Sequence, residues 1–165
     1  MTNRSTPRLP PEFLAMMAKG VSAIVASRDA QLRPSLMRAV GSKVEDEGRV
    51  ITVYLSRPQS RQVLQDIAAT GQLAVVFSQP STHRTVQLKA THATLRDATQ
   101  DDAPALAAYC RSLSEELGSL GYSGELAPRM LAHRLDEVVA VSFTPEQATD
   151  QTPGPRAGAP LRAAP

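Results

Sequence analysis

Apolar and polar residues alternate along much of this chain with the spacing of strands, interrupted by short helical patterns. Six stretches have the length and the β-branched or alternating composition of strands: residues 21–26, 35–44, 49–55, 73–77, 85–95 and 138–143. Four stretches carry apolar residues at helical spacing or open with a proline or an N-cap residue: residues 10–18, 60–69, 101–117 and 128–135. Turns rather than helices join most of the strands. The pattern therefore predicts a mainly β fold, an antiparallel β-barrel with peripheral helices.

The C-terminal part differs in composition from the rest. Residues 151–165 contain four Pro, two Gly and four Ala, with few large apolar side chains. Such a segment buries too little apolar surface to offset the entropy lost on ordering. We therefore expect one barrel domain over residues 1–146 and an extended Pro/Gly/Ala-rich tail over residues 147–165.

Composition indicates an intracellular globular protein. Of the 165 residues, 42 % are hydrophobic and 21 % are charged, and no apolar run approaches the roughly 18 residues that span a bilayer. The N-terminal segment lacks the basic start and apolar run of a signal peptide. The single cysteine, Cys110, has no partner for an internal disulfide, which agrees with a reducing compartment. We therefore expect a cytoplasmic protein that does not associate with membranes.

Charge is distributed unevenly along the chain, although the net charge is only +2. Residues 28–96 hold ten Lys or Arg against five Asp or Glu, whereas residues 97–150 hold three against ten. A basic half indicates a phosphate group, a nucleic acid or an acidic partner surface. Proteins that bind single-stranded nucleic acids stack the bases on aromatic side chains, and this chain has only three Tyr, three Phe and no Trp. We therefore expect a small anionic ligand and no nucleic acid.

No familiar catalytic or metal-binding motif is present in the sequence. It contains no Gly-rich dinucleotide fingerprint, no P-loop and no Gly-x-Ser-x-Gly nucleophile elbow. The three histidines, His83, His92 and His133, lack the spacing of metal ligands. We therefore predict no metal site and assign no catalytic residue.

Cations with short polar neighbours lie in three separate segments. The segments contain, in chain order, Arg38 with Ser42 and Lys43, then Ser60 with Arg61, then Arg84 with Thr85, Gln87 and Lys89. Arginine binds a phosphate through paired hydrogen bonds, and the N-terminus of a helix offers it free backbone N–H groups. Each cation alone is explained as well by a solvated surface charge. The three segments together favour a single phosphate-binding site.

These segments, in this order, resemble the pyridoxamine 5′-phosphate oxidase-like family of FMN-binding split β-barrels. Residues 38–43, Arg-Ala-Val-Gly-Ser-Lys, are similar to the family's Arg-x-Val-x-x-Lys strand. Residues 55–61, Leu-Ser-Arg-Pro-Gln-Ser-Arg, resemble its strand-to-helix segment that ends in Ser-Arg, and residues 82–90 resemble the strand that follows. The resemblance spans residues 9–146.

The resemblance implies a split β-barrel with FMN as cofactor, and a homodimer with the cofactor at the seam between its subunits. It assigns Arg38 and Lys43 to the FMN phosphate, with help from Ser60 and Arg61. The remaining positions that it assigns to the cofactor pocket are Ala39, Val40, Gly41, Ser42, Leu55, Ser56, Thr85 and Gln87. Thr85 stands where the oxidases have a flavin-contacting glutamine, and Gln87 is the nearest amide that could substitute for it.

The C-terminal part departs from the true oxidases. They hold their substrate with an Arg-x-His pair after a tryptophan-containing stretch, whereas this chain has no Trp and reads Phe143-Thr144-Pro145-Glu146 before the tail. We therefore expect no vitamin B6 oxidase activity, but a flavin-dependent oxidoreductase of unknown substrate. Two alternatives stay open. One is a non-catalytic haem- or flavin-binding protein, with His92 or His133 as the haem iron ligand, and the other is an F420-dependent reductase of the same barrel.

Overall fold

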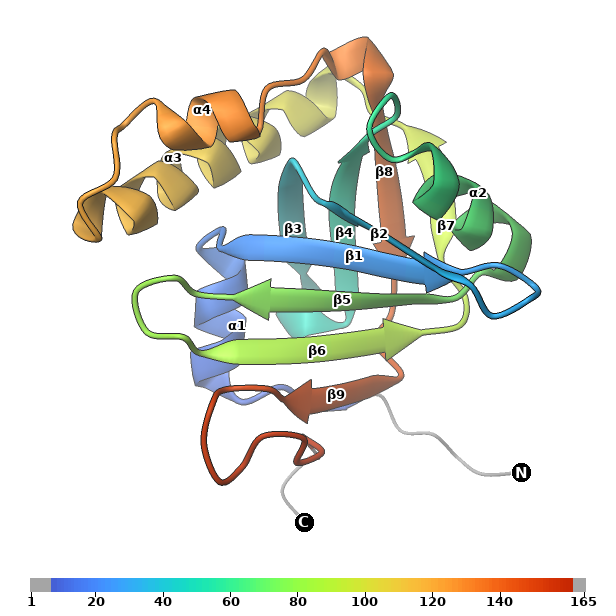
Figure 1. Ribbon diagram of the computed structural model, residues 1–165, viewed down its shortest axis with the longest axis horizontal. Coiled ribbons are helices and arrows are strands. Elements are labelled where there is room, and N and C mark those ends of the chain that lie inside the picture. Colours follow the sequence, from blue (N-terminus) through green and yellow to red (C-terminus); the bar gives the residue numbers. More distant parts are fainter. Residues whose placement is uncertain (1–6, 162–165) are drawn as a thin grey trace.

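A computed structural model describes residues 7–161 as two antiparallel sheets with helices around them (Figure 1). The five-stranded sheet has the order β2-β1-β5-β6-β9, and the four-stranded sheet has the order β3-β4-β8-β7. The strands of the first sheet are β1 (Ser22–Arg28), β2 (Pro34–Arg38), β5 (Leu73–Ser78), β6 (Thr85–Ala90) and β9 (Gln147–Asp150). Those of the second are β3 (Gly41–Glu45), β4 (Val50–Ser56), β7 (Thr94–Asp97) and β8 (Val138–Phe143). The two sheets share no strand pair among these residues, so hydrogen bonds do not close a barrel.

The hydrophobic core lies between the two sheets. In β1, β5 and β6 every second side chain is buried, and in β6 this follows the alternation predicted from the sequence. The inward-facing residues include Val25, Phe77 and Leu88 from the first sheet and Ile51 and Val53 from the second. Transfer of each such side chain out of water contributes about 1.5–3 kcal/mol. This burial fixes which face of the five-stranded sheet points outward.

Two helices complete this core at its open sides. The helix α1 (Pro11–Ala18) lies behind the five-stranded sheet at one end and buries Phe13, Met16 and Met17 (Figure 1). The helix α2 (Arg61–Thr70) lies near β2 and β7, which are edge strands of different sheets (Figure 1). Its buried side chains, Val63, Leu64 and Ile67, belong to the core cluster. The helices expected at 10–18 and 60–69 are therefore confirmed.

Each of the two longest predicted strands is in fact two strands, one in each sheet, so both predictions were wrong. In the stretch 35–44, β2 ends at Arg38 and β3 begins at Gly41. Between them the N–H of Ala39 donates to Ala23 of the first sheet (2.9 Å) and the N–H of Val40 to Tyr54 of the second (2.8 Å). In the stretch 85–95, residues 91–93 separate β6 from β7. Side-chain alternation continues through such a crossover and carries no information on a change of partner strand.

The helices α3 (Ala103–Ser119) and α4 (Leu126–Met130) form a hairpin at one end of the sheets (Figure 1). They enclose a small core of their own, made of Tyr109, Leu113, Ala127 and Leu131. The helix expected at 128–135 was misplaced, because α4 ends at Met130 and only a 3₁₀ turn, η3 (Leu135–Glu137), follows. No helix within residues 7–161 is long and apolar enough to cross a membrane.

Part of the stretch expected as a tail lies against the five-stranded sheet. Its first residues form β9, which pairs with β6 and buries Ala148. The chain then folds back, so that the N–H of Gly158 donates to Asp150 (2.6 Å) and the N–H of Leu161 to Ala148 (2.8 Å). The remaining tail residues, 162–165, lie outside the described part of the chain.

Candidate functional site

The outer face of the five-stranded sheet brings several of the predicted site residues together. We use the name outer face for the side chains that alternate with the core residues of β1, β2, β5, β6 and β9. The strand register places Arg38, Ile24, Val76, Gln87 and Thr149 in one row across the sheet. Thr85 lies on the same face, opposite Ser78, with their hydroxyl oxygens 2.8 Å apart. Figure 1 looks onto this face, and the helices lie beside or behind it.

The outer face is apolar at its centre and basic at its margins. Ile24, Ala26, Ala74 and Val76 form the centre, and Leu36 beside them is 64 % exposed. The charged side chains of the face are all cations: Arg28, Arg38 and Lys89. A broad uncovered apolar surface with basic margins is suited to a planar anionic ligand or a second subunit.

The crossover from β2 to β3 carries the predicted Arg-x-Val-x-x-Lys segment. The Arg38 guanidinium donates to Ser22 Oγ (2.7 Å) at the outer face. Ala39 and Val40 are buried, and Gly41 lies against α3. A Cβ at position 41 would come within 2.7 Å of Leu106 Cδ2, so that side of Gly41 is covered by the helix.

Lys43 lies further along the β3–β4 hairpin. Its ammonium group is 2.8 Å from the carboxylate of Glu45, and both side chains are about half exposed. In the strand register Lys43 lies opposite Thr52 of β4. Thr52 is four residues before Ser56, a distance of about 13 Å along the strand. Lys43 is therefore near the opposite end of β4 from the end that leads into α2.

Two predicted site residues carry buried hydroxyl groups without a hydrogen-bond partner. Within residues 7–161, Ser42 Oγ and Ser60 Oγ are the buried side-chain polar atoms in this state. Ser60 occupies the N-cap position of α2 as predicted, but its side chain makes no capping hydrogen bond. A buried hydroxyl left unpaired costs about 1–3 kcal/mol, and native proteins contain few of them. Both hydroxyls are therefore candidates for contact with a bound ligand.

The other two predicted residues of the 55–61 segment lie at the end of β4. Leu55 is fully buried and belongs to the core between the sheets, so it does not face an open pocket. Ser56 is the last residue of β4, is 6 % exposed and accepts the N–H of Gln59 in the turn that precedes α2.

Arg61 lines a cavity of about 490 Å³ between α2 and β7. The floor of the cavity is apolar, and three arginines line it: Arg57, Arg61 and Arg96. Arg57 pairs with Asp97, which also lines the cavity, whereas the Arg61 side chain has no ion pair with another described residue. The net positive charge of this lining favours an anion. Arg38 and Lys43 do not line this cavity, so a single chain presents the three predicted phosphate ligands at separate places.

A buried carboxylate connects this cavity to the crossover. Asp102 accepts hydrogen bonds from both terminal nitrogens of Arg96 (2.7 and 2.8 Å) and from the Tyr54 hydroxyl (2.8 Å). The Arg96 guanidinium holds the pKa of Asp102 well below its usual range, and burial raises the pKa of Tyr54 well above its own. Tyr54 is the strand partner of Gly41.

The sequence interpretation did not single out Arg57 or Arg96. Arg57 stands inside the motif at 55–61, so its position was a usable signal. Arg96 follows a crossover that the sequence pattern does not reveal.

The histidines considered for haem lie outside regular elements. His133, expected in a helix, follows α4 and lines a cavity of about 340 Å³ between α3 and α4, together with Cys110. His92, expected on a strand, is exposed between β6 and β7, and its Nδ1 is 3.3 Å from Glu146. The part of the chain that the structure describes contains no cluster of three metal-ligating residues.

Solved structures with the same arrangement of sheets include HupZ of Group A Streptococcus. It is 13 % identical, with a TM-score of 0.55 over 91 % of this chain and 99 % of that one. A proposed pyridoxamine 5′-phosphate oxidase of Lactobacillus delbrueckii is 15 % identical, with a TM-score of 0.54 over 90 % and 96 %. An F420 reductase is 9 % identical, with a TM-score of 0.54 over 86 % and 98 %. The fold is a split β-barrel.

The predicted fold class is thereby confirmed, with two separate sheets in place of a closed barrel. The sequence matches no protein-family model and no curated protein. At these identities the structural likeness extends to the fold alone.

Proposed function

We propose that this protein binds FMN at the seam of a homodimer and acts as a flavin-dependent oxidoreductase. The observation that carries the proposal is the pair of buried, unpartnered hydroxyls of Ser42 and Ser60. Both belong to the segments that resemble the phosphate site of FMN-binding split barrels. A phosphate offers the acceptor oxygens that these hydroxyls lack. The chemistry of these two side chains suits a phosphate group.

The phosphate end of the site is built around the start of α2. Arg61 is the first residue of this helix, where free backbone N–H groups and the helix dipole add to its charge. Arg38 and Lys43 would supply two more cations, and the Lys43 ammonium group is paired with the Glu45 carboxylate in the chain itself. Because one chain presents these cations at separate places, the proposal places the complete site between two chains.

The ring end of the site is the outer face. Ile24 and Val76 offer a flat apolar support, and Gln87 and Thr85 offer an amide and a hydroxyl to the polar edge of a flavin. The exposed Leu36 is then covered by the second subunit, in an isologous contact that repeats every interaction twice. This contact also excludes water from the cofactor.

The flavin supplies the hydride chemistry when it is bound, and the chain binds and orients it. We name no catalytic base, because within residues 7–161 the charged side chains of the outer face are the cations Arg28, Arg38 and Lys89. We place the protein in the cytoplasm, which agrees with its single cysteine.

F420 is the second candidate cofactor. The cavity beside α2 is lined by three arginines, of which Arg57 pairs with Asp97 and Arg96 with Asp102, so Arg61 is the cation left to bind a phosphate of either cofactor. The occurrence of the same fold in an F420 reductase supports this alternative.

The test is the absorbance spectrum of the purified protein, followed by titration with FMN, F420 and haem and by its mass in solution. Under the proposal FMN binds, one molecule per chain, to a dimer. The Arg61→Gln variant weakens FMN binding about tenfold, because it loses a charge-assisted hydrogen bond. Arg49→Gln, an exposed cation paired with Asp46, is the matched control. A colourless monomer that takes up none of the three cofactors contradicts the proposal.

A further inference from the structure

A second cavity, of about 310 Å³, lies at the Arg28 end of the outer face. Strands β1, β5 and β6 all contribute to it, and so does the first residue of β9. Alanine side chains form much of its lining, and Arg28, Lys89 and Gln72 provide polar groups. The cavity is separate from the one beside α2, with which it shares no residue.

The charged residues that line this cavity are both cations. Lys89 has no ion pair with another described residue, and the Arg28 guanidinium donates only to a backbone oxygen, that of Asp29 (3.0 Å). Two positive charges beside a partly apolar cavity, neither of them in an ion pair with a described residue, favour an anion there.

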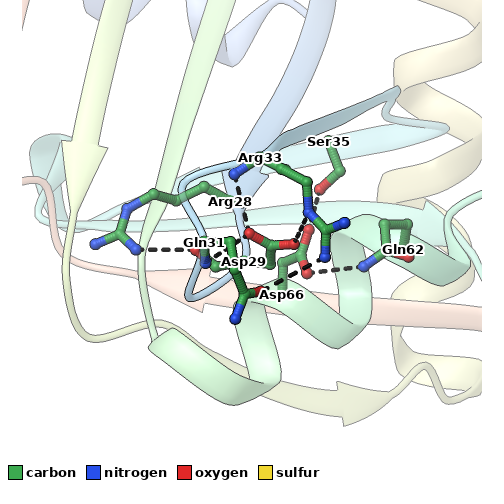
Figure 2. Close-up of polar contacts among 7 residues, drawn as sticks. All are labelled: Arg28, Asp29, Gln31, Arg33, Ser35, Gln62 and Asp66. Atoms are coloured by element: carbon green, nitrogen blue, oxygen red, sulfur yellow. Dashed lines mark hydrogen bonds and ion pairs between the residues drawn. The ribbon is translucent and has the colours of Figure 1, made fainter.

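The carboxylate nearest to Arg28 in sequence is already engaged elsewhere. Asp29 accepts the backbone N–H groups of Gln31 and Arg33 (both 2.9 Å) and the Nε of Arg33 (2.7 Å). These contacts with Arg33 hold the pKa of Asp29 below its usual range. Figure 2 shows the Arg28 side chain directed away from this cluster.

Glu146 accepts the backbone N–H (2.7 Å) and the hydroxyl (2.6 Å) of Thr91, which lines the cavity. Asp66 is also engaged. It accepts the hydroxyl of Ser35 (2.5 Å) and the amide of Gln62 (2.9 Å), and it is buried (Figure 2). Neither the Asp29 nor the Asp66 carboxylate forms an ion pair with Arg28.

We propose that this cavity is an anion subsite that holds the carboxylate or phosphate of a small amphipathic substrate. Arg28 and Lys89 bind the anionic group, and the apolar body lies along Ala26 and Ala74. The next row of the outer face, Ile24 and Val76, is two residues along each strand, or about 7 Å. Anion binding stands on its own, whereas the role in turnover rests on the proposed function.

Benzoate and phenyl phosphate are suitable probes, and benzyl alcohol is the neutral control of similar shape. Calorimetric titration of the full chain is expected to show binding of at least one of the two anions and at least tenfold weaker binding of the alcohol. The anion that binds with the higher affinity shows whether the site prefers a carboxylate or a phosphate. Equal binding of the anions and the alcohol overturns the proposal.

Two variants assign the binding to this cavity. Arg28→Gln and Lys89→Gln are each expected to weaken anion binding about tenfold, the size of one lost charge-assisted hydrogen bond. Arg111→Gln, an exposed cation on α3 that makes the same change in net charge, is the control and is expected to change binding less than twofold. Anion binding that both cavity variants retain at full strength overturns the proposal. Thermal unfolding of each variant verifies that it is folded.

A last measurement separates this inference from the proposed function. In the protein loaded with FMN, the tighter anion is expected to shift the visible spectrum of the flavin, and Arg28→Gln to abolish the shift. Anion binding without such a shift overturns the role in turnover but leaves the anion site. Failure of FMN to bind, with anion binding intact, contradicts the proposed function alone.

Discussion

Gly41 and Leu106 are packed so closely that residue 41 has no room for a side chain. A Cβ on Gly41 would lie 2.7 Å from Leu106 Cδ2 and 3.2 Å from Tyr54 Cδ2. Leu106 is itself 3 % exposed and has little space to withdraw. This contact seats α3 on the strand that follows the crossover.

The variant Gly41→Ala is expected to lower the free energy of unfolding by about 1–2 kcal/mol, because the added methyl group forces Leu106 or β3 to shift. Gly118→Ala is the matched control, since it lies in α3 with nothing within 4 Å of the new methyl group. It should raise stability by up to about 1 kcal/mol through helix propensity. Urea denaturation measures both. Combining Gly41→Ala with Leu106→Val should recover part of the loss, and no loss in Gly41→Ala contradicts the contact.

The variants Ser42→Ala and Ser60→Ala are expected to leave the apoprotein as stable as the parent chain or to stabilise it. Each removes a buried hydroxyl that has no partner among the described residues, so no hydrogen bond is lost. If these hydroxyls contact the cofactor phosphate, the same variants weaken FMN binding by about fivefold or more. Urea denaturation and fluorescence titration measure the two effects. A destabilised apoprotein that binds FMN normally contradicts the ligand role of both serines.

The variant Asp102→Asn is expected to lower the free energy of unfolding at pH 7 by about 2–3 kcal/mol, because hydrogen bonds to a charged, buried carboxylate are lost. The pKa of Asp102 is lower in the folded chain than in the unfolded one, where it is about 3.9. The contribution of ionised Asp102 to the free energy of unfolding is therefore fully present above about pH 3.9 and is lost as the pH falls towards the pKa of the folded chain. The difference between parent and variant should shrink from pH 7 to pH 3, whereas the exposed Asp101→Asn should have little effect at either pH. A pH-independent difference contradicts this assignment.

The variant Leu36→Asp tests the outer face as the dimer seam. Leu36 is 64 % exposed in the single chain, so the substitution should change the stability of the monomer by no more than about 0.5 kcal/mol. At a seam the same charge is buried without a partner and should dissociate the dimer. Light scattering measures the mass. Leu120→Asp, on the exposed loop after α3, is the control and should leave the mass unchanged. A Leu36→Asp variant that keeps the mass of a dimer places the seam elsewhere.

Local sequence patterns were sufficient for most elements of this fold. Strand-length runs of β-branched, apolar or alternating residues identified β1, β4, β5 and β8, and the proline pair at 10–11 and Gly71 marked limits of α1 and α2. These signals are local, because the alternating direction of side chains along a strand and the left-handed conformation of Gly71 are properties of a few consecutive residues. The same signals identified the strand segments that carry Arg38, Thr85 and Gln87.

The candidate site depended more on tertiary structure. Whether Arg38, Lys43 and Arg61 lie together is decided by the crossover at 39–40 and by the packing of α2 between two sheet edges. The cavity that joins Arg96 to Arg61, and the one that joins Arg28 to Lys89, each bring together residues from strands or helices distant in sequence.

The sequence by itself thus predicted most of the elements, the split-barrel fold class and the excess of cations in the first half of the chain. Only the tertiary structure decided where each strand changes sheets and which cations have no acidic partner. The physical reason is that periodicity reports whether a side chain is buried, but not which strand lies beside it. Arg28 has no counterion because Arg33 takes the carboxylate of Asp29, and sequence alone did not reveal that competition.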